Sequence, residues 1–184
     1  TEENGQRCWN VKALFRAILE GMKKCKKAGK SPVSMGIDTW AVDFVLLDKE
    51  NKMLGDAVGY RDSRTAGMDE KVYEIIPEEK LYERTGIQKQ IFNTIYQLMA
   101  VKSNNPEILE HAETMLMIPE YFNYLLTGEK ASEYTNATTT QLVSPETKDW
   151  DYELIEMLGY PKHIFQKIKK PGTVLGNLTK EIQK

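Results

Sequence analysis

Apolar residues recur every three or four positions along residues 11–28, and this spacing predicts an amphipathic helix. Gly29 follows the pattern directly and is expected to end the helix. Lysines gather at the same end, where their charge offsets the helix dipole, so they indicate a solvated helix end better than a nucleic-acid surface. The apolar face comprises Val11, Leu14, Phe15, Ile18, Leu19, Met22 and Cys25.

The pattern then changes to that of β-strands. Val33, Met35 and Ile37 alternate with other residues, which is typical of a strand with one buried face. Residues 44–47 are continuously apolar, as in a strand that is buried on both faces, and we therefore expect a pair of strands here. Residues 48–52 form a polar turn, and a return strand is expected to follow it.

Helices are expected to dominate the middle of the chain, where proline, glycine and asparagine mark their ends. Pro77 separates two helices, and Gly86 stops the second of them. Asn93 is placed to cap a third helix, which the Asn-Asn-Pro sequence of residues 104–106 ends.

The last third of the chain predicts both kinds of element. Residues 115–118 predict a short buried strand, and Pro119 fits the first turn of a helix that Gly128 closes. Residues 133–143 are rich in threonine, which favours extended structure. A last helix is expected over residues 150–158.

Strands early, helices in the middle and strands again predict a layered α/β domain. A chain of 184 residues with 41% hydrophobic content can bury one core, and no internal repeat or low-complexity linker divides it. Thr1 opens the chain without a methionine, Asn4 and Gly5 form a turn pair that ought to join two strands, and Lys184 falls inside a charged run. We therefore expect a piece of a longer domain, truncated at both ends.

Composition narrows the class of partner. A net charge of -2, with both signs spread along the chain, argues against binding to nucleic acid or to a membrane surface. No apolar run approaches the ~18 residues that span a bilayer, and the N-terminus has no signal-peptide pattern. Cys8 and Cys25 are too few for a disulfide scaffold, and the isolated His111 and His163 match no metal motif. We expect a cytoplasmic protein whose partners are small molecules, and the sequence predicts no oligomeric state.

A polar break between the two predicted strands, residues 38–43, carries the chemistry that we expect to matter most. Trp40 lies in this break, and an indole can cover the apolar face of a sugar while polar neighbours bond its hydroxyls. A tryptophan is about as often a core residue as a ligand platform, and the polar surroundings favour the platform. Asp43 in the same break is a candidate sugar ligand, whereas Asp48 suits the turn.

Further candidates lie downstream of this break. Arg61, Asp62 and Arg64 carry charged groups that either lock their own loop or reach a ligand. Asn93 and Gln97 stand one helical turn apart at a helix start, so both can face a cleft and bond hydroxyls. An asparagine in that position is more often an N-cap.

Several blocks of residues, in a constant order, resemble the N-terminal domain of the FGGY carbohydrate kinases, and within that family its L-rhamnulose branch. The Asp-Thr-Trp element at residues 38–40 and the Tyr-Thr-Asn-Ala-Thr-Thr-Thr-Gln element at residues 134–141 are specific to that branch. The resemblance implies the RNase H-like, actin-like fold of sugar kinases with a helical insertion. The blocks are residues 35–48, 60–64, 82–88, 92–98, 116–121 and 133–142.

The resemblance also implies a function. The whole protein is expected to transfer the γ-phosphate of ATP, with Mg2+, to the 1-hydroxyl of the ketose L-rhamnulose. The catalytic aspartate, the phosphate-binding hairpin and the C-terminal ATP-binding domain all fall outside residues 1–184. This partial N-terminal domain is therefore expected to hold the sugar, to bind no ATP or metal, and to be inactive by itself. Sugar contacts are implied for Thr39, Trp40, Ala41, Asp43 and Asn93.

Ala41 departs from the family pattern, which has glycine there so that the backbone can approach the sugar closely. Two alternatives stay open, the first of them because the extra methyl group adds bulk to the pocket. One is a kinase of another sugar or polyol, of the xylulose, fuculose or glycerol type. The other is a non-catalytic sugar-binding or helical interaction module.

Overall fold

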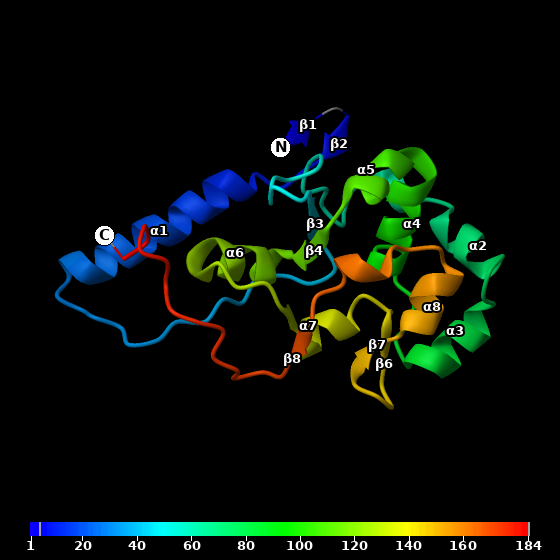
Figure 1. Ribbon diagram of the computed structural model, residues 1–184. Helices are drawn as coiled ribbons and strands as arrows, with labels where there is room; N and C mark the ends of the chain where they lie inside the picture. Colours follow the sequence, from blue (N-terminus) through cyan, green and yellow to red (C-terminus); the bar gives the residue numbers. More distant parts are fainter. Residues whose placement is uncertain (4, 184) are drawn as a thin grey trace.

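Two short antiparallel strands, β3 (Phe44–Leu47) and β4 (Thr114–Met117), lie between groups of helices (Figure 1). The computed structural model describes residues 1–3 and 5–183. Phe44 pairs with Met117 and Leu47 with Thr114, and every residue of both strands is buried. The predicted strand over residues 44–47 and its burial on both faces are therefore confirmed.

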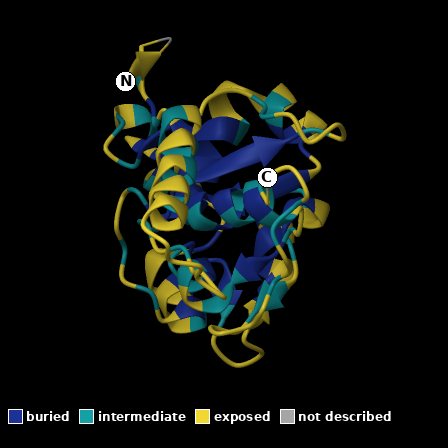
Figure 2. Ribbon diagram, turned by 90° about the vertical axis from the view of Figure 1, so that its left-hand side faces the viewer, coloured by how far each residue is buried: buried dark blue, intermediate teal, exposed yellow. Residues whose placement is uncertain are grey.

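Alternate side chains of β3 enter two different hydrophobic clusters. Phe44 and Leu46 belong to the large cluster, which we define as these two residues of β3, Met115 and Met117 of β4, and the buried apolar residues of 68–112 and 137–165. Val45 and Leu47 belong to the small cluster, which contains apolar residues of α1 (Val11–Lys27) and α6 (Ile118–Thr127). Figure 2 shows the central strand in dark blue, whereas the outer helices are mostly exposed or intermediate.

The remaining strands are short and pair two by two. β1 (Glu2–Glu3) pairs with β2 (Gln6–Arg7), β5 (Ser132–Glu133) with β8 (Ile168–Lys169), and β6 (Val143–Ser144) with β7 (Asp149–Trp150). The predicted Asn4-Gly5 turn includes Asn4, which lies outside the described residues. The other helices are α2 (Met68–Tyr73), α3 (Glu78–Thr85), α4 (Thr94–Asn104), α5 (Pro106–His111), α7 (Tyr134–Thr138) and α8 (Tyr152–Met157), with single 3-10 turns η1 (Ser63–Thr65) and η2 (Lys162–Ile164).

Most predicted helix boundaries are confirmed, because the residues that mark them adopt the expected backbone. Asn10 accepts a hydrogen bond from Ala13 N at 2.9 Å and so caps α1. Gly86 and Gly128 follow α3 and α6 with φ of 67° and 79°, a left-handed conformation that stops a helix. Pro119 lies in the first turn of α6, as expected.

The predicted strand over residues 33–37 is wrong. This segment is irregular, and Val33 is fully exposed at 102% of its reference surface. Among the described residues none forms a ladder with it, so its backbone groups gain no partner that would hold them extended. The return strand after the 48–52 turn is likewise reduced to one bridge between Leu47 and Met53.

The extended structure predicted for residues 133–143 is also wrong, since most of it is the short helix α7 and a turn. Glu133 accepts hydrogen bonds from Thr135 N at 3.0 Å and Asn136 N at 2.8 Å, which starts a helix. Thr139 and Thr140 donate their hydroxyls to carbonyls three residues earlier, at 2.7 Å and 2.6 Å. Such local bonds outweigh the intrinsic preference of threonine for strands.

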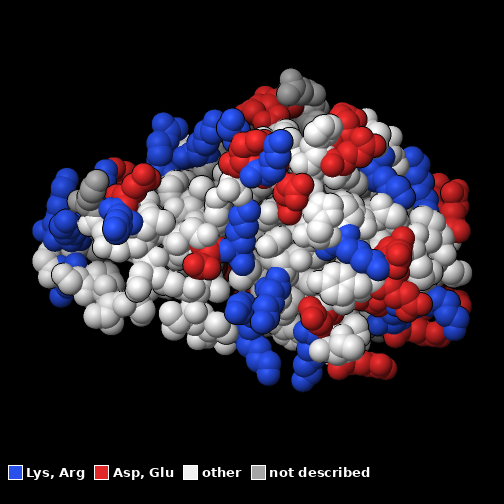
Figure 3. All heavy atoms as spheres, viewed as in Figure 1, with Lys and Arg blue, Asp and Glu red and all other residues white. Residues whose placement is uncertain are grey.

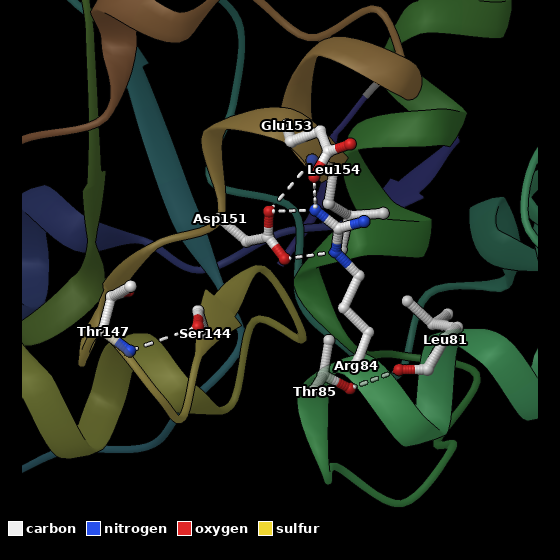
Figure 4. Close-up of polar contacts among 8 residues, drawn as sticks. All are labelled: Leu81, Arg84, Thr85, Ser144, Thr147, Asp151, Glu153 and Leu154. Carbon is white, nitrogen blue, oxygen red and sulfur yellow. Dashed lines mark hydrogen bonds and ion pairs between the residues drawn. The ribbon is translucent and has the colours of Figure 1, made fainter.

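Arg84 ties α3 to the start of α8 (Figure 4). Its Nε and Nη2 donate to the two oxygens of Asp151 at 2.5 Å and 2.7 Å, and Nη2 also donates to Glu153 at 2.7 Å. Asp151 caps α8 by accepting from Leu154 N at 3.1 Å. Burial alone raises the pKa of Asp151, but the bonds from Arg84 and Leu154 N bring it below the ordinary value.

Charged side chains of both signs are interspersed over the face shown in Figure 3, with lysines concentrated towards the free end of α1. In the part of the chain that the structure describes, none of the helices combines the length and the apolar character needed to cross a membrane.

Candidate functional site

The carboxylate of Asp43, at the start of β3, is the centre of a polar cluster inside the domain. Its side chain is 0% exposed. Oδ2 accepts hydrogen bonds from Trp9 Nε1 at 2.6 Å, Trp40 Nε1 at 3.0 Å and Tyr60 N at 3.0 Å, while Oδ1 accepts from Gln97 Nε2 at 3.0 Å. Burial raises the pKa of Asp43, and these four donors oppose that rise by favouring the carboxylate.

Two pairs of aromatic rings come from the segments that meet at this carboxylate and at Gln97, and we call Trp9, Trp40, Tyr60 and Phe92 the aromatic clamp. The rings of Trp9 and Trp40 lie 4.2 Å apart between centroids, and those of Tyr60 and Phe92 lie 5.4 Å apart. All four rings are half-buried. Because its Nε1 is bonded to Asp43 and one side contacts Trp9, the indole of Trp40 is fixed in place while part of it reaches solvent.

A strained turn joins Trp40 to Asp43. Val42 has a φ of 67°, a left-handed conformation that is rare for a β-branched residue. The amide of Asp43 donates to the carbonyl of Ala41 at 2.9 Å, which makes residues 41–43 a γ-turn. Such backbone strain is unfavourable by about 1–3 kcal/mol and is often found at ligand sites. The chain also passes from the surface into the interior at this turn, since Ala41 is half-buried and Val42 is buried.

Two side chains of α4 bond the carbonyl of Val42. Thr94 Oγ1 donates to it at 2.7 Å and Gln97 Nε2 at 3.1 Å. The other end of the Gln97 amide accepts from Arg64 Nη2 at 2.6 Å. Gln97 therefore lies between the carboxylate of Asp43 and the guanidinium of Arg64.

The loop that carries Arg61, Asp62 and Arg64 is held mainly by Asp62. Its oxygens accept from Arg7 N and Arg64 N, both at 2.8 Å, so this side chain locks the loop against β2. Burial lowers the pKa of Arg64 to about 10, and its Nε has no partner among the described residues. Arg61 is exposed and donates from Nε to the hydroxyl of Tyr60 at 3.1 Å.

Comparison with known proteins decides the family. The model of the N-terminal domain of the FGGY family of carbohydrate kinases matches residues 1–184. The chain belongs to the FGGY family.

Curated FGGY relatives named rhamnulokinase cover nearly all of the chain. The protein of Halalkalibacterium halodurans is 60% identical over 180 residues, which are 98% of this chain and 38% of that protein. The protein of Oceanobacillus iheyensis is 54% identical over the same shares, and that of Mannheimia succiniciproducens is 44% identical over 95% of this chain and 36% of the relative. The chain thus spans about two fifths of the length of these relatives.

Solved FGGY structures share the fold. A gluconate kinase from Lactobacillus acidophilus has a TM-score of 0.89 at 22% identity, with 99% of this chain and 37% of that chain covered. A xylulose kinase from Rhodospirillum rubrum has a TM-score of 0.88 at 19% identity, with 99% and 38% covered. The chain therefore has the fold of an FGGY N-terminal domain, as the sequence predicted.

The structure brings most of the predicted sugar residues together. Trp40 belongs to the aromatic clamp, Thr39 and Ala41 are its neighbours in the chain, and all three are half-buried. Asp43 lies behind the surface, where its oxygens bond protein donors and fix the two indoles, and its direct contact with a sugar stays a prediction. Asn93 occupies the N-cap position of α4 but makes no capping bond, and it is 3% exposed.

Trp9 and Thr94 belong to the site but were not found from the sequence. Trp9 lies 34 positions before Asp43, and a tryptophan just ahead of a helix does not differ in sequence from a core residue. Thr94 follows Asn93, which is the more conspicuous candidate because asparagine is a common helix cap. The strain at Val42 has no sequence signal, since valine is the residue least expected there.

Two pockets lie elsewhere in the domain, and of these the first shares Arg64 with the cluster around Asp43. One of about 440 Å³ is lined by Phe44, Arg64 and residues of α4 and α5, and one of about 380 Å³ by residues of α2, α3 and the loop after α3. In the described residues no group of three or more His, Cys, Asp or Glu side chains gathers as a metal ion would need. We assign no Mg2+ ligand among these residues and no chemical step through the metal.

Proposed function

We propose that this chain supplies the sugar-binding part of an ATP-dependent carbohydrate kinase that phosphorylates the 1-hydroxyl of L-rhamnulose. The observation that carries the proposal is the 60% identity, over 98% of this chain, with the Halalkalibacterium halodurans protein named rhamnulokinase. The solved kinases of gluconate and xylulose are at most 22% identical and support only the fold. They do not favour another substrate.

The geometry around Trp40 supports a sugar-holding role. A fixed, partly exposed indole offers an apolar surface without losing side-chain entropy when a ring settles on it. Thr39 adds a hydroxyl, whose donor currently bonds the carbonyl of Trp40 at 3.2 Å. Ala41 adds a backbone amide and a methyl group that limits the depth of the site.

Phosphate transfer needs groups that cradle the ATP phosphates, bind Mg2+ and accept the proton of the sugar hydroxyl. We assign none of these tasks to residues of this chain. We therefore propose that residues 1–184 alone bind sugar weakly and transfer no phosphate, and that activity requires a protein of the length of the FGGY relatives.

A coupled assay of ADP production tests the proposal on the longer protein and on residues 1–184 in parallel. L-Rhamnulose, D-xylulose, L-fuculose and glycerol are compared as substrates at equal concentrations. We expect the highest kcat/KM with L-rhamnulose for the longer protein, and no activity for residues 1–184. For the longer protein, preference for another of these substrates, or sugar binding without ADP production, would overturn the proposal, and so would ADP production by residues 1–184 alone.

A substitution at the platform adds a residue-level test. Trp40→Ala in the longer protein is expected to raise KM for the preferred sugar by about tenfold or more, because an aromatic contact of this kind contributes about 1–2 kcal/mol. Tyr82→Ala is the matched control, since Tyr82 is a 57% exposed ring on α3. Equal KM values for the two variants would contradict a platform at Trp40.

A further inference from the structure

We propose that Thr94 and Gln97 are positioning residues, which hold the carbonyl of Val42 and thereby fix how Trp40 and Ala41 face a bound sugar. The inference rests on the proposed function, because it assigns a task within the same site. Neither side chain needs to touch the sugar, since Thr94 is 0% and Gln97 1% exposed.

The γ-turn at Val42 needs support from outside the turn. Its internal bond, from Asp43 N to Ala41 O, gives the carbonyl of Val42 no partner. A buried carbonyl without a donor is unfavourable, so the hydroxyl of Thr94 at 2.7 Å and the amide of Gln97 at 3.1 Å favour this turn over an ordinary strand start. The two side chains therefore stabilise the strained conformation that carries Trp40.

The amide of Gln97 can face only one way. Its oxygen accepts from the guanidinium of Arg64 at 2.6 Å, and its nitrogen donates to the carboxylate of Asp43 at 3.0 Å. A flipped amide would place each end against a group of the wrong polarity. The orientation of Gln97 is thus fixed by the charges on either side. Its nitrogen also donates to the carbonyl of Phe92, at 2.9 Å.

Both donors come from the first turn of α4, and this helix is the most deeply buried in the domain. Every residue from Thr94 to Val101 is buried, and the apolar ones belong to the large cluster. The partly exposed segment 39–41 is therefore anchored to a rigid element rather than to its own flexible neighbours.

Two substitutions at position 94 separate positioning from packing in the longer protein. Thr94→Val keeps the shape of the side chain but removes the hydroxyl, and we expect KM for L-rhamnulose to rise about tenfold with kcat changed less than about twofold. Thr94→Ser keeps the hydroxyl and loses a methyl group. It is expected to lower the melting temperature while leaving KM within about twofold of the original protein.

Thr85→Val is the matched control. Thr85 is also buried, at 3% exposure, and its hydroxyl donates to a backbone carbonyl, that of Leu81 at 2.9 Å, on α3 (Figure 4). This variant loses the same kind of bond away from the site, so its stability is expected to fall and its KM to stay unchanged. Gln97→Met provides a second test, in which KM rises as it does for Thr94→Val.

The indole N–H resonance of Trp40 gives a readout that does not depend on activity. In 15N-tryptophan spectra of the same protein we expect this resonance to shift in Thr94→Val and to stay in place in Thr85→Val. An unchanged KM and an unchanged resonance in both Thr94→Val and Gln97→Met would overturn the positioning role. If the original protein neither binds nor phosphorylates L-rhamnulose, the proposed function fails, whereas the resonance still reports whether α4 holds the turn.

Discussion

The two clusters on either side of β3 both consist of buried apolar residues, but the small cluster has more half-buried apolar residues packed against it than the large one. In the large cluster, Ile95, Tyr96 and Leu98 of α4 are all 0% exposed. The members of the small cluster are buried as well, but Leu14 and Phe15 of α1, which pack against it, are only half-buried, although their spacing predicts an equally clear apolar face. Periodicity thus predicts which face of a helix is apolar, and tertiary contacts decide how completely that face is covered.

The candidate site lies where these two clusters meet. Trp9 and Trp40 contact the small cluster, whereas Thr94 and Gln97 belong to the buried helix next to the large one. The rings that are available to a ligand therefore come from the less buried side, and the groups that hold them come from the more buried side. Substitutions on the two sides should differ accordingly.

The largest difference is expected between Leu98→Ala and Leu14→Ala. Leu98 is 0% exposed, so its truncation leaves a cavity and should lower the free energy of unfolding by about 3–4 kcal/mol. Leu14 is half-buried and borders solvent, and its truncation should lower the free energy of unfolding by about 1 kcal/mol. Urea unfolding followed by circular dichroism measures both, and equal losses would contradict the contrast between the clusters.

The next largest effect is expected from Arg84→Met, which removes the ion pair with Asp151 on the side of the large cluster. The side chain of Asp151 is 8% exposed and would be left without its cationic partner. The free energy of unfolding should therefore fall by about 2–3 kcal/mol. Because the pKa of Asp151 is lowered in the folded state, its contribution is present above the unfolded pKa, near 4, and is lost as the pH falls through the folded value.

The difference in unfolding free energy between the original protein and Arg84→Met should therefore be full at about pH 7 and shrink below about pH 4. Lys80→Met is the control, because Lys80 forms an exposed pair with Glu83 at 2.7 Å on the same helix. It should change the urea midpoint little at either pH. A pH-independent difference for Arg84→Met would contradict the ion pair as its cause.

Asp43→Asn tests the site where the two clusters meet, and its effect on stability is expected to be smaller. An asparagine amide would face one or two of the donors that now bond the carboxylate, so stability should fall by about 1–2 kcal/mol. The pKa of Asp43 is raised by burial, so ionising it makes the folded state less stable as the pH rises above about 4. The gap between the two proteins should therefore be widest near pH 4 and narrow towards pH 7, and the opposite trend would contradict a raised pKa.

The smallest effect is expected from Val33→Lys, in the segment beside the small cluster. Val33 is fully exposed, so a lysine there should change the free energy of unfolding by less than about 0.5 kcal/mol. Thermal unfolding measures the change, and Val45→Lys, in buried β3, should prevent folding by comparison. A large loss of unfolding free energy in Val33→Lys would contradict the exposed position of Val33 and favour the predicted strand at residues 33–37.

The sequence predicted what local chemistry determines and missed what distant partners determine. Gly86 and Gly128 end helices through their own backbone preference, and both boundaries are as expected. Residues 33–37 alternate like a strand, but a strand needs a neighbour that alternation does not supply. The helix α7 depends on the cap by Glu133, which the composition of threonines hides.

The same distinction applies to the candidate site. Trp40 and Asp43 stand together in the sequence and were found together, whereas Trp9 reaches the same carboxylate from 34 positions away. The burial of Asp43 could not be predicted, because it depends on donors from four separate segments. How a sugar contacts Thr39, Trp40 and Ala41 stays a prediction for the experiments above.

β3 is only four residues long, yet it contributes side chains to both clusters. A slip of its pairing with β4 by one residue would exchange its faces, bringing Val45 into the large cluster and Phe44 into the small one. Opening of this strand therefore disrupts both clusters at once, and the slowest hydrogen exchange of its amides reports on unfolding of the whole domain. Its partner β4 also contributes to both clusters, through Met115 and Met117 on one side and Leu116 on the other, so we expect the two clusters to unfold together.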